Sequence, residues 1–192
     1  ANSVTYERVL QGLKDALAGK AVAGPEDGQL VPTLIELART TEGAANQAAA
    51  DKFLAENGKL PGVVTTASGL QYKILRQGSG EPPKATDEVT VNYTGSLLNG
   101  TVFDSSYKRN EPLVTPLNGL IKGWSEALLL MKPGSKVELY IPPALGYGAN
   151  SPPPIPPDSL LKFQVELLSF KPASAASARP APGGAPAASR HP

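Results

Sequence analysis

The stretch VTVNYTGSLLNGTVFDSSYKRNEPL, from Val89 to Leu113, decides the fold of this chain. From Glu88 to Gly95 apolar and polar residues alternate, and this period of two is typical of a strand with one buried face. Asn99-Gly100 then marks a hairpin turn, because both residue types accept a positive φ angle. The stretch therefore predicts a strand that ends in a hairpin.

The same alternation returns on both sides of this stretch. Ile121–Met131 is the only segment of this region with helical spacing, and it ends before Pro133-Gly134. A run of strands with one short helix predicts an α+β fold, in which an antiparallel sheet wraps around that helix. The further predicted strands are Leu70–Arg76, Lys136–Ile141 and Lys162–Phe170.

Residues 1–60 have a different pattern and predict an all-α module of two helices. In the first helix, large apolar residues recur every three or four positions until Gly19 and Gly24-Pro25 interrupt them. The second helix is expected to begin near Gln29, to bend at Gly43 and to end at Asn57-Gly58. The apolar positions of the first helix are Tyr6, Leu10, Leu13 and Leu17.

Two thin helices cannot bury their own apolar stripes, which leaves two interpretations of this module. It either folds onto the globular domain of its own chain, or it pairs with a second copy and forms a homodimer. The segment after Lys171 has no aromatic residue and no aliphatic residue larger than alanine. Residues 172–192 are therefore predicted to be a disordered Ala/Pro-rich tail, and the globular domain between the helices and the tail is placed at 61–171.

Composition excludes several classes of function for this 192-residue chain. With no cysteine, it has neither disulfides nor thiol chemistry, and its only histidine, His191, lies in the tail. The net charge of +1 implies no surface that grips nucleic acid, and the longest apolar run, Ala127–Met131, is too short to span a membrane. The chain begins at Ala1 rather than Met, so we expect a processed or truncated N-terminus, for example after removal of an export signal.

No familiar catalytic constellation is present in the predicted domain, and we expect no metal and no cofactor. Its most distinctive side chains are aromatic: Tyr93, Phe103, Trp124, Tyr147 and Phe163. These rings either fill a small core or form a concave pocket for flat or ring-shaped apolar groups such as proline.

Four runs of the domain resemble the FKBP family in order and in spacing across roughly 100 residues. The stretch Phe53–Leu75 is similar to the junction of the Mip (macrophage infectivity potentiator) subgroup of bacterial FKBPs, in which helices precede the domain and dimerise. The matching runs are Val89–Leu113, LIKGWSEALLLMKPG (Leu120–Gly134), IPPALGYG (Ile141–Gly148) and IPPDSLLKFQVELL (Ile155–Leu168).

The resemblance implies a peptidyl-prolyl cis–trans isomerase with a prolyl pocket on a strongly twisted antiparallel sheet. Trp124 would form the pocket floor, the Ile121 amide and the Tyr147 hydroxyl would donate hydrogen bonds, and Asp104 would face the substrate. Asp104 either stabilises the substrate electrostatically or only holds the loop through Arg109. The implied catalytic residues are Tyr93, Phe103, Asp104, Ile121, Trp124, Tyr147 and Phe163, and the implied substrate-binding residues are Arg109, Leu113, Leu120 and Ile155.

Two rim positions, Leu113 and Thr115, depart from the aromatic residues common in the family, and the loop Ser151–Pro157 holds no aromatic residue or histidine. Peptide preference and drug affinity therefore transfer less well than the pocket floor. The implied partners are proline-containing unfolded or folding polypeptides, with macrolides of the rapamycin and tacrolimus type as inhibitors.

Three functions remain open at this point. The chain is an active isomerase on unfolded proteins, a chaperone or peptide-binding module that uses its helical arms, or an interaction protein tethered by its tail. The subgroup implies the periplasm or outer membrane of a Gram-negative bacterium, and the alternative is the cytoplasm.

Overall fold

The computed structural model describes the backbone of residues 30–172 and the side chains of residues 35–172. The chain divides into two compact units, Ala1–Glu42 and Gly43–Pro192. The predicted first helix lies outside the described residues, and so does the predicted tail from residue 173 on, including His191.

The first described element is the helix α2, Leu30–Asn57. It ends at Asn57 as predicted, and the Gly58 N–H donates to the Leu54 carbonyl at 3.0 Å. The helix continues through Gly43 without interruption, past the residue where a bend was predicted. One glycine costs a helix only about 1 kcal/mol relative to alanine, which 27 other helical residues readily offset.

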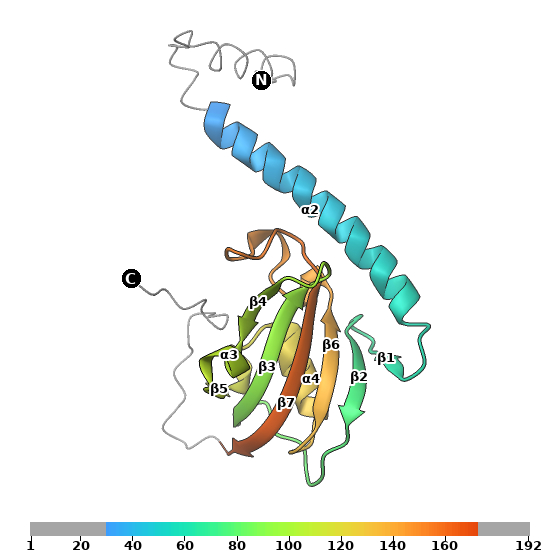
Figure 1. The fold of residues 1–192 in the computed structure, drawn as a ribbon, viewed down its shortest axis with the longest axis vertical. Coiled ribbons are helices and arrows are strands. Elements are labelled where there is room, and N and C mark those ends of the chain that lie inside the picture. The colour runs from blue at the N-terminus through green and yellow to red at the C-terminus, as the bar shows by residue number, and fades with distance from the viewer. Residues whose placement is uncertain (1–29, 173–192) are drawn as a thin grey trace. The chain divides into compact units, whose positions relative to one another are not determined.

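The domain is built on one seven-stranded sheet, in the order β1-β2-β6-β7-β3-β4, with β5 also paired to β3. All neighbouring strands are antiparallel (Figure 1). The last described strand, β7, is central, since it pairs with both β3 and β6. The strands are β1 (Val63–Thr65), β2 (Gln71–Arg76), β3 (Glu88–Leu97), β4 (Val102–Ser105), β5 (Leu113–Pro116), β6 (Lys136–Ile141) and β7 (Leu161–Lys171).

The helix α4, Lys122–Leu130, supplies the second layer, and Figure 1 shows the long strands curving around it. Its buried residues Trp124, Ala127 and Leu128 pack in one core cluster with the inward positions of the strands. The inward positions alternate with outward ones along β3 and β7, as the period of two requires. This arrangement confirms the predicted α+β fold with an antiparallel sheet wrapped around one helix.

The prediction missed the shortest elements of the domain. The strands β1, β4 and β5 have three or four residues each, too few for a period of two to stand out. The structure also adds a one-turn helix, α3 (Ser106–Arg109), so α4 is not the only helical segment of the domain. The α3 helix is closed by Asn110 in the left-handed conformation, with φ of 52°.

The predicted hairpin between β3 and β4 is present, but only one of its two residues takes a positive φ. Gly100 has φ of 85°, while Asn99 uses its side-chain carbonyl to accept the Thr101 N–H at 2.9 Å. The Gly100 N–H donates to the Leu97 carbonyl at 3.0 Å. The tight turn therefore depends on Gly100 for its backbone and on Asn99 for its side chain.

The C-terminal half of α2 packs against the domain. Ala50 is fully buried in a small cluster with Tyr140 and Leu160, and the Phe53 ring lies 5.5 Å from the Tyr140 ring between centroids. At the end of the helix, the Asn57 amide donates to the Gln71 side chain at 2.8 Å. The interpretation that the module folds onto its own domain thus holds for this half of the helix.

Candidate active site

Four aromatic rings from the sheet and α4 meet edge to face at the centre of the domain. Trp124 and Phe163 have ring centroids 5.1 Å apart with an interplanar angle of 90°, and Trp124 and Tyr93 are at 5.2 Å and 87°. Phe103 meets Phe163 at 5.5 Å and 87°. Edge-to-face pairs are the favoured geometry of aromatic contacts, so the rings fix one another's orientation.

The close approach of these rings requires a glycine on β3. A Cβ on Gly95 would come within 2.6 Å of the Phe163 ring and within 2.7 Å of the Phe103 ring. Only glycine leaves room for both rings to lie over the strand at this point. The sequence analysis did not single out Gly95, although an isolated glycine in a strand pattern is a known sign of such an approach.

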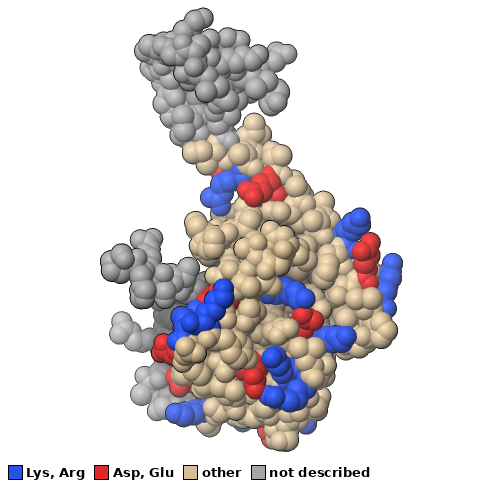
Figure 2. Space-filling model, viewed as in Figure 1, with Lys and Arg blue, Asp and Glu red and all other residues tan. Residues whose placement is uncertain are grey.

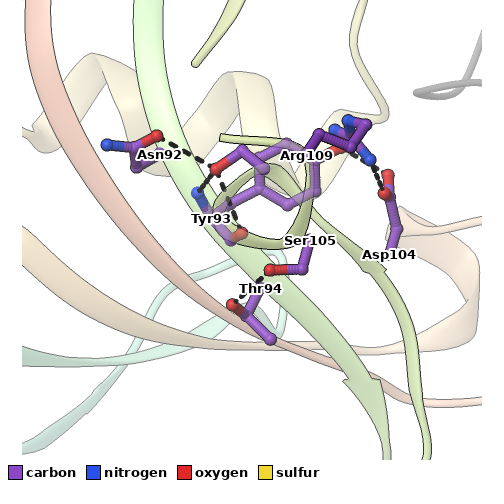
Figure 3. Close-up of polar contacts among 7 residues, drawn as sticks. Asn92, Tyr93, Thr94, Asp104, Ser105 and Arg109 are labelled. Carbon is purple, nitrogen blue, oxygen red and sulfur yellow. Dashed lines mark hydrogen bonds and ion pairs between the residues drawn. The ribbon is translucent and has the colours of Figure 1, made fainter. Parts of the chain in front are cut away.

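A polar network closes one side of the ring cluster. The Tyr93 hydroxyl donates to Oδ2 of Asp104, and Arg109 pairs with Oδ1 of the same carboxylate. Arg109 also donates to the Tyr93 hydroxyl at 2.9 Å. Figure 3 shows Asp104 and Arg109 pointing toward one another from β4 and α3. Both oxygens of the Asp104 carboxylate are thus engaged, and its side chain is only 8% exposed.

The one-turn helix that carries Arg109 is pinned to β3 by a buried serine. The Ser106 hydroxyl accepts the Tyr93 N–H at 2.9 Å and lies 3.0 Å from the Asn92 side-chain carbonyl (Figure 3). Ser106 is the first residue of α3 and is fully buried. This anchor places Asp104 before it and Arg109 after it around the same phenol. Sequence reasoning missed Ser106 because a serine among polar loop residues carries no recognisable signal.

Burial also affects the two tyrosines of the site. It raises the pKa of Tyr93 above its ordinary value, with a further contribution from the hydrogen bond to Asp104. Burial and the negative charge of Asp104 raise the pKa of Tyr147 to about 12. Both phenols therefore stay protonated at neutral pH and can donate hydrogen bonds.

Two donors at the site have no acceptor within the described part of the chain. The Ile121 amide precedes the first turn of α4 and donates to no group among residues 30–172. The Tyr147 hydroxyl likewise has no hydrogen-bond partner in that range, and its oxygen is not fully buried. Free donors beside an apolar cluster suit the carbonyl groups of a bound peptide.

The other predicted residues lie around the same cluster. Ile155 belongs to its buried core, while Leu113 and Leu120 are partly buried against it, as are Phe103, Ile121 and Tyr147. Thr115 lies on β5 opposite Val89 and is half-buried. The structure therefore brings the predicted residues together, but their roles in binding and catalysis stay predictions. Among residues 30–172 no group of three His, Cys, Asp or Glu side chains is placed to hold a metal, and no helix is long and apolar enough to cross a membrane.

Two family models match the chain. The model of the FKBP-type peptidyl-prolyl cis-trans isomerase matches residues 79–168. The model of the domain amino terminal to FKBP-type peptidyl-prolyl isomerase matches residues 1–74. The two matches together cover most of the chain.

Curated relatives agree with these models. The peptidyl-prolyl cis-trans isomerase Mip of Coxiella burnetii is 56% identical over 120 residues, which are 62% of this chain and 52% of the relative. The FKBP-type peptidyl-prolyl cis-trans isomerase FkpA of Escherichia coli is 39% identical over 182 residues, 91% of this chain and 67% of the relative. The outer membrane protein MIP of Legionella longbeachae is 46% identical over 130 residues, 67% of this chain and 56% of the relative.

The solved structure of FkpA from Escherichia coli resembles this one with a TM-score of 0.71 and 38% identity. The similarity covers 90% of this chain and 85% of that chain. The chain itself spans between half and two thirds of the length of the curated relatives described above.

Proposed function

The chain belongs to the FKBP-type peptidyl-prolyl cis-trans isomerase family, and we propose that it accelerates rotation about X–Pro bonds in unfolded and folding polypeptides. The observation that carries this proposal is the edge-to-face cluster of Tyr93, Trp124 and Phe163 beside two free donors. We propose Tyr93, Phe103, Asp104, Ile121, Trp124, Tyr147 and Phe163 as its catalytic residues, and Arg109, Leu113, Leu120 and Ile155 as substrate-binding residues.

The reaction makes unusual demands on a catalyst, because no bond is broken and no proton leaves. Its barrier, roughly 18–20 kcal/mol without catalysis, comes from the resonance of the amide. That resonance is lost in the twisted transition state, so the prolyl nitrogen becomes more basic and the carbonyl less polar. An apolar pocket disfavours the planar, charge-separated amide and therefore lowers the barrier.

The side chains of the site fit these demands. The prolyl ring would lie over the Trp124 indole between the walls formed by Tyr93 and Phe163. The Ile121 amide and the Tyr147 hydroxyl would bind backbone carbonyls of the peptide and hold it while the bond turns. Each tenfold gain in rate needs only about 1.4 kcal/mol of preferential binding to the transition state. A few such contacts are enough for a useful acceleration.

Asp104 serves as a fixed charge in this mechanism and not as a general base. Its two oxygens are held by Tyr93 and Arg109, so it is ill placed to take up a proton from a substrate. It orients the Tyr93 ring, which is itself part of the ring cluster. The structural role and the electrostatic role of Asp104 are thus compatible.

The decisive experiment measures the cis–trans isomerisation of a short X–Pro peptide with and without rapamycin. We expect acceleration that the drug abolishes, because macrolides of the rapamycin and tacrolimus type would occupy the same aromatic pocket. Well-folded protein that gives no acceleration would contradict the proposal. The chain would then act on polypeptides only as a chaperone or binding module.

We also propose that the N-terminal helices form a homodimer that assists folding. Ile35 and Leu37 of α2 are 56% and 48% exposed, and large apolar side chains at that exposure favour a partner surface. The proposed boundaries are 1–60 for the helical module, 61–171 for the isomerase domain and 172–192 for the tail. Sedimentation of the intact chain and of an Ile35→Glu, Leu37→Glu variant tests the homodimer, because only the intact chain should sediment as a dimer.

A location in the periplasm or at the outer membrane is the last part of the proposal. It is supported by the relative from Legionella longbeachae, which is named an outer membrane protein. Cell fractionation of the producing organism tests it, and recovery with the cytoplasmic fraction would contradict it. The proposal includes no nucleic-acid partner, because Figure 2 shows basic and acidic side chains interspersed over the face in view.

A further inference from the structure

A cleft without charged side chains lies apart from the ring cluster, and we call it the hairpin cleft. Its walls come from α2, from the turn between β3 and β4, and from the segment before β7. This half-open cleft has a volume of about 150 Å³, similar to that of a cavity that in another protein holds benzene. The hairpin cleft is lined by Asn46, Ala49, Leu97, Leu98, Asn99, Pro156, Ser159 and Leu160.

The walls of the hairpin cleft are held by specific contacts, so the space is preformed. The Asn46 amide donates to the Pro157 carbonyl at 2.9 Å, and the Ser159 hydroxyl donates to the Pro156 carbonyl at 2.9 Å. Gly43 allows α2 to approach this segment, because a Cβ there would come within 2.7 Å of Oδ2 of Asp158. The Asn46 hydrogen bond thus ties the helix to this segment.

The hairpin cleft adjoins the proposed isomerase site through the same segment. Pro156 follows Ile155, which is buried in the core cluster that contains Trp124 and Phe163. The Asp158 N–H donates to the carbonyl of Gly148, the residue after Tyr147, at 2.9 Å. One face of this short segment therefore belongs to the isomerase site, and the other forms a wall of the hairpin cleft.

The chemistry of the hairpin cleft selects its occupant. Leu98 is 39% exposed at its edge, Leu97 is partly buried, and none of the eight lining side chains is charged. Covering these leucines removes apolar area from water at about 25 cal/mol per Å². An uncharged, apolar side chain such as leucine or phenylalanine matches this lining.

We propose that the hairpin cleft is a second subsite that binds an apolar side chain of the same client polypeptide whose proline occupies the isomerase site. The inference rests on the proposed function. Once the proline is bound, the second contact is intramolecular, so even a weak subsite raises the affinity for long, unfolded chains. Folded proteins bury their apolar side chains, and for this reason the subsite favours non-native clients.

The test compares peptides that differ only in whether they can reach the hairpin cleft. The first is a four-residue X–Pro peptide. The others are twelve-residue peptides with the same X–Pro bond, in which one leucine is moved along the flanking serines. We expect kcat/KM to rise at least threefold for a leucine at one spacing from the proline, relative to the all-serine peptide.

Two variants on α2 locate this gain. Ala49→Phe fills the cleft from its helical wall and should bring the leucine and serine peptides to equal kcat/KM. Ala48→Phe is the matched control, because Ala48 is exposed on the same helix and does not line the cleft. It should keep the threefold gain.

Each other outcome overturns one proposal only. Equal kcat/KM for all twelve-residue peptides in the unmodified chain removes the second subsite, while activity on the four-residue peptide leaves the isomerase function standing. A gain that survives Ala49→Phe also removes it. If Ala49→Phe instead changes the sedimentation of the chain, the cleft is an interface between copies and not a client site. No acceleration of the four-residue peptide overturns the isomerase function itself.

Discussion

The Tyr93 hydroxyl donates a hydrogen bond to the Asp104 carboxylate, and Asp104 lies on the neighbouring strand β4. This bond orients the Tyr93 ring, which forms one side of the ring cluster. Arg109 completes the triangle by binding both partners. The Tyr93 ring can reorient only if these hydrogen bonds break. The polar network and the aromatic cluster of the site therefore move together.

Replacing Asp104 by asparagine should lower kcat/KM on a short X–Pro peptide about tenfold, or about 1.4 kcal/mol. The amide keeps the shape, but its nitrogen cannot accept a hydrogen bond, and the neutral side chain no longer forms an ion pair with Arg109. The isomerisation assay on the short X–Pro peptide measures this change. An unchanged kcat/KM for Asp104→Asn would contradict the role of Asp104 as a fixed charge.

Removing the free hydroxyl by Tyr147→Phe should lower kcat/KM by about two- to twelvefold, because one hydrogen bond to the substrate is worth about 0.5–1.5 kcal/mol. The ring stays in place, so stability to urea should change by less than about 1 kcal/mol. Tyr107→Phe is the matched control, since the Tyr107 hydroxyl bonds to Glu166 at 3.0 Å on the exposed face of the sheet. Equal activity of the two variants would remove Tyr147 from the site.

The variant Gly95→Ala should destabilise the domain by about 1–3 kcal/mol and reduce its activity. The added Cβ meets the rings of Phe103 and Phe163, which must both move. Urea unfolding followed by Trp124 fluorescence measures the loss. Gly119→Ala provides the comparison, because nothing lies within 4 Å of a Cβ at that position and its φ is not positive. Similar stability of the two variants would contradict the crowding argument.

Alkaline pH should destabilise the folded chain. Burial raises the pKa of Tyr93 and Tyr140 above the ordinary value and that of Tyr147 to about 12. Between pH 10 and 12 the unfolded chain releases these protons while the folded chain retains them, so the free energy of unfolding falls as pH rises. Each tyrosine contributes up to about 1.4 kcal/mol per pH unit.

Urea unfolding at pH 8, 9, 10 and 11 checks this sign. The free energy of unfolding should show no loss from these tyrosines up to about pH 9 and then decrease. Tyr140→Phe should make the decrease shallower, because it removes one phenol whose pKa is raised by burial and by its hydrogen bond to Glu138 at 2.7 Å. A free energy that rises above pH 10 would show that these phenols do not hold their protons in the folded state.

The long elements could be predicted from the sequence because their apolar residues repeat often enough to define a period. Lys136–Ile141 was predicted at its observed bounds, and the helix bearing Trp124 within one residue at each end. The elements that build the polar side of the site were not predicted. The Arg109 position depends on a one-turn helix, a left-handed Asn110 and the buried hydroxyl of Ser106, and none of these leaves a periodic signal.

The aromatic candidates stood out in the sequence itself, whereas their roles and the other candidate residues came from the resemblance. Pattern alone left open whether the aromatic residues fill a core or line a pocket, and the structure shows why this was hard to decide. Tyr93, Trp124 and Phe163 are at most 2% exposed, so the same rings serve as core and as site. Gly95 was the one readable sign of their close approach.

The position of β7 in the sheet has a consequence for how this chain is made. The last eleven described strand residues lie between β6 and β3, so the two parts of the sheet cannot join until Lys171 has left the ribosome. A growing chain therefore exposes the inward faces of β3 and β6 throughout its synthesis. The folded sheet therefore forms late, only once β7 is available to join its two parts.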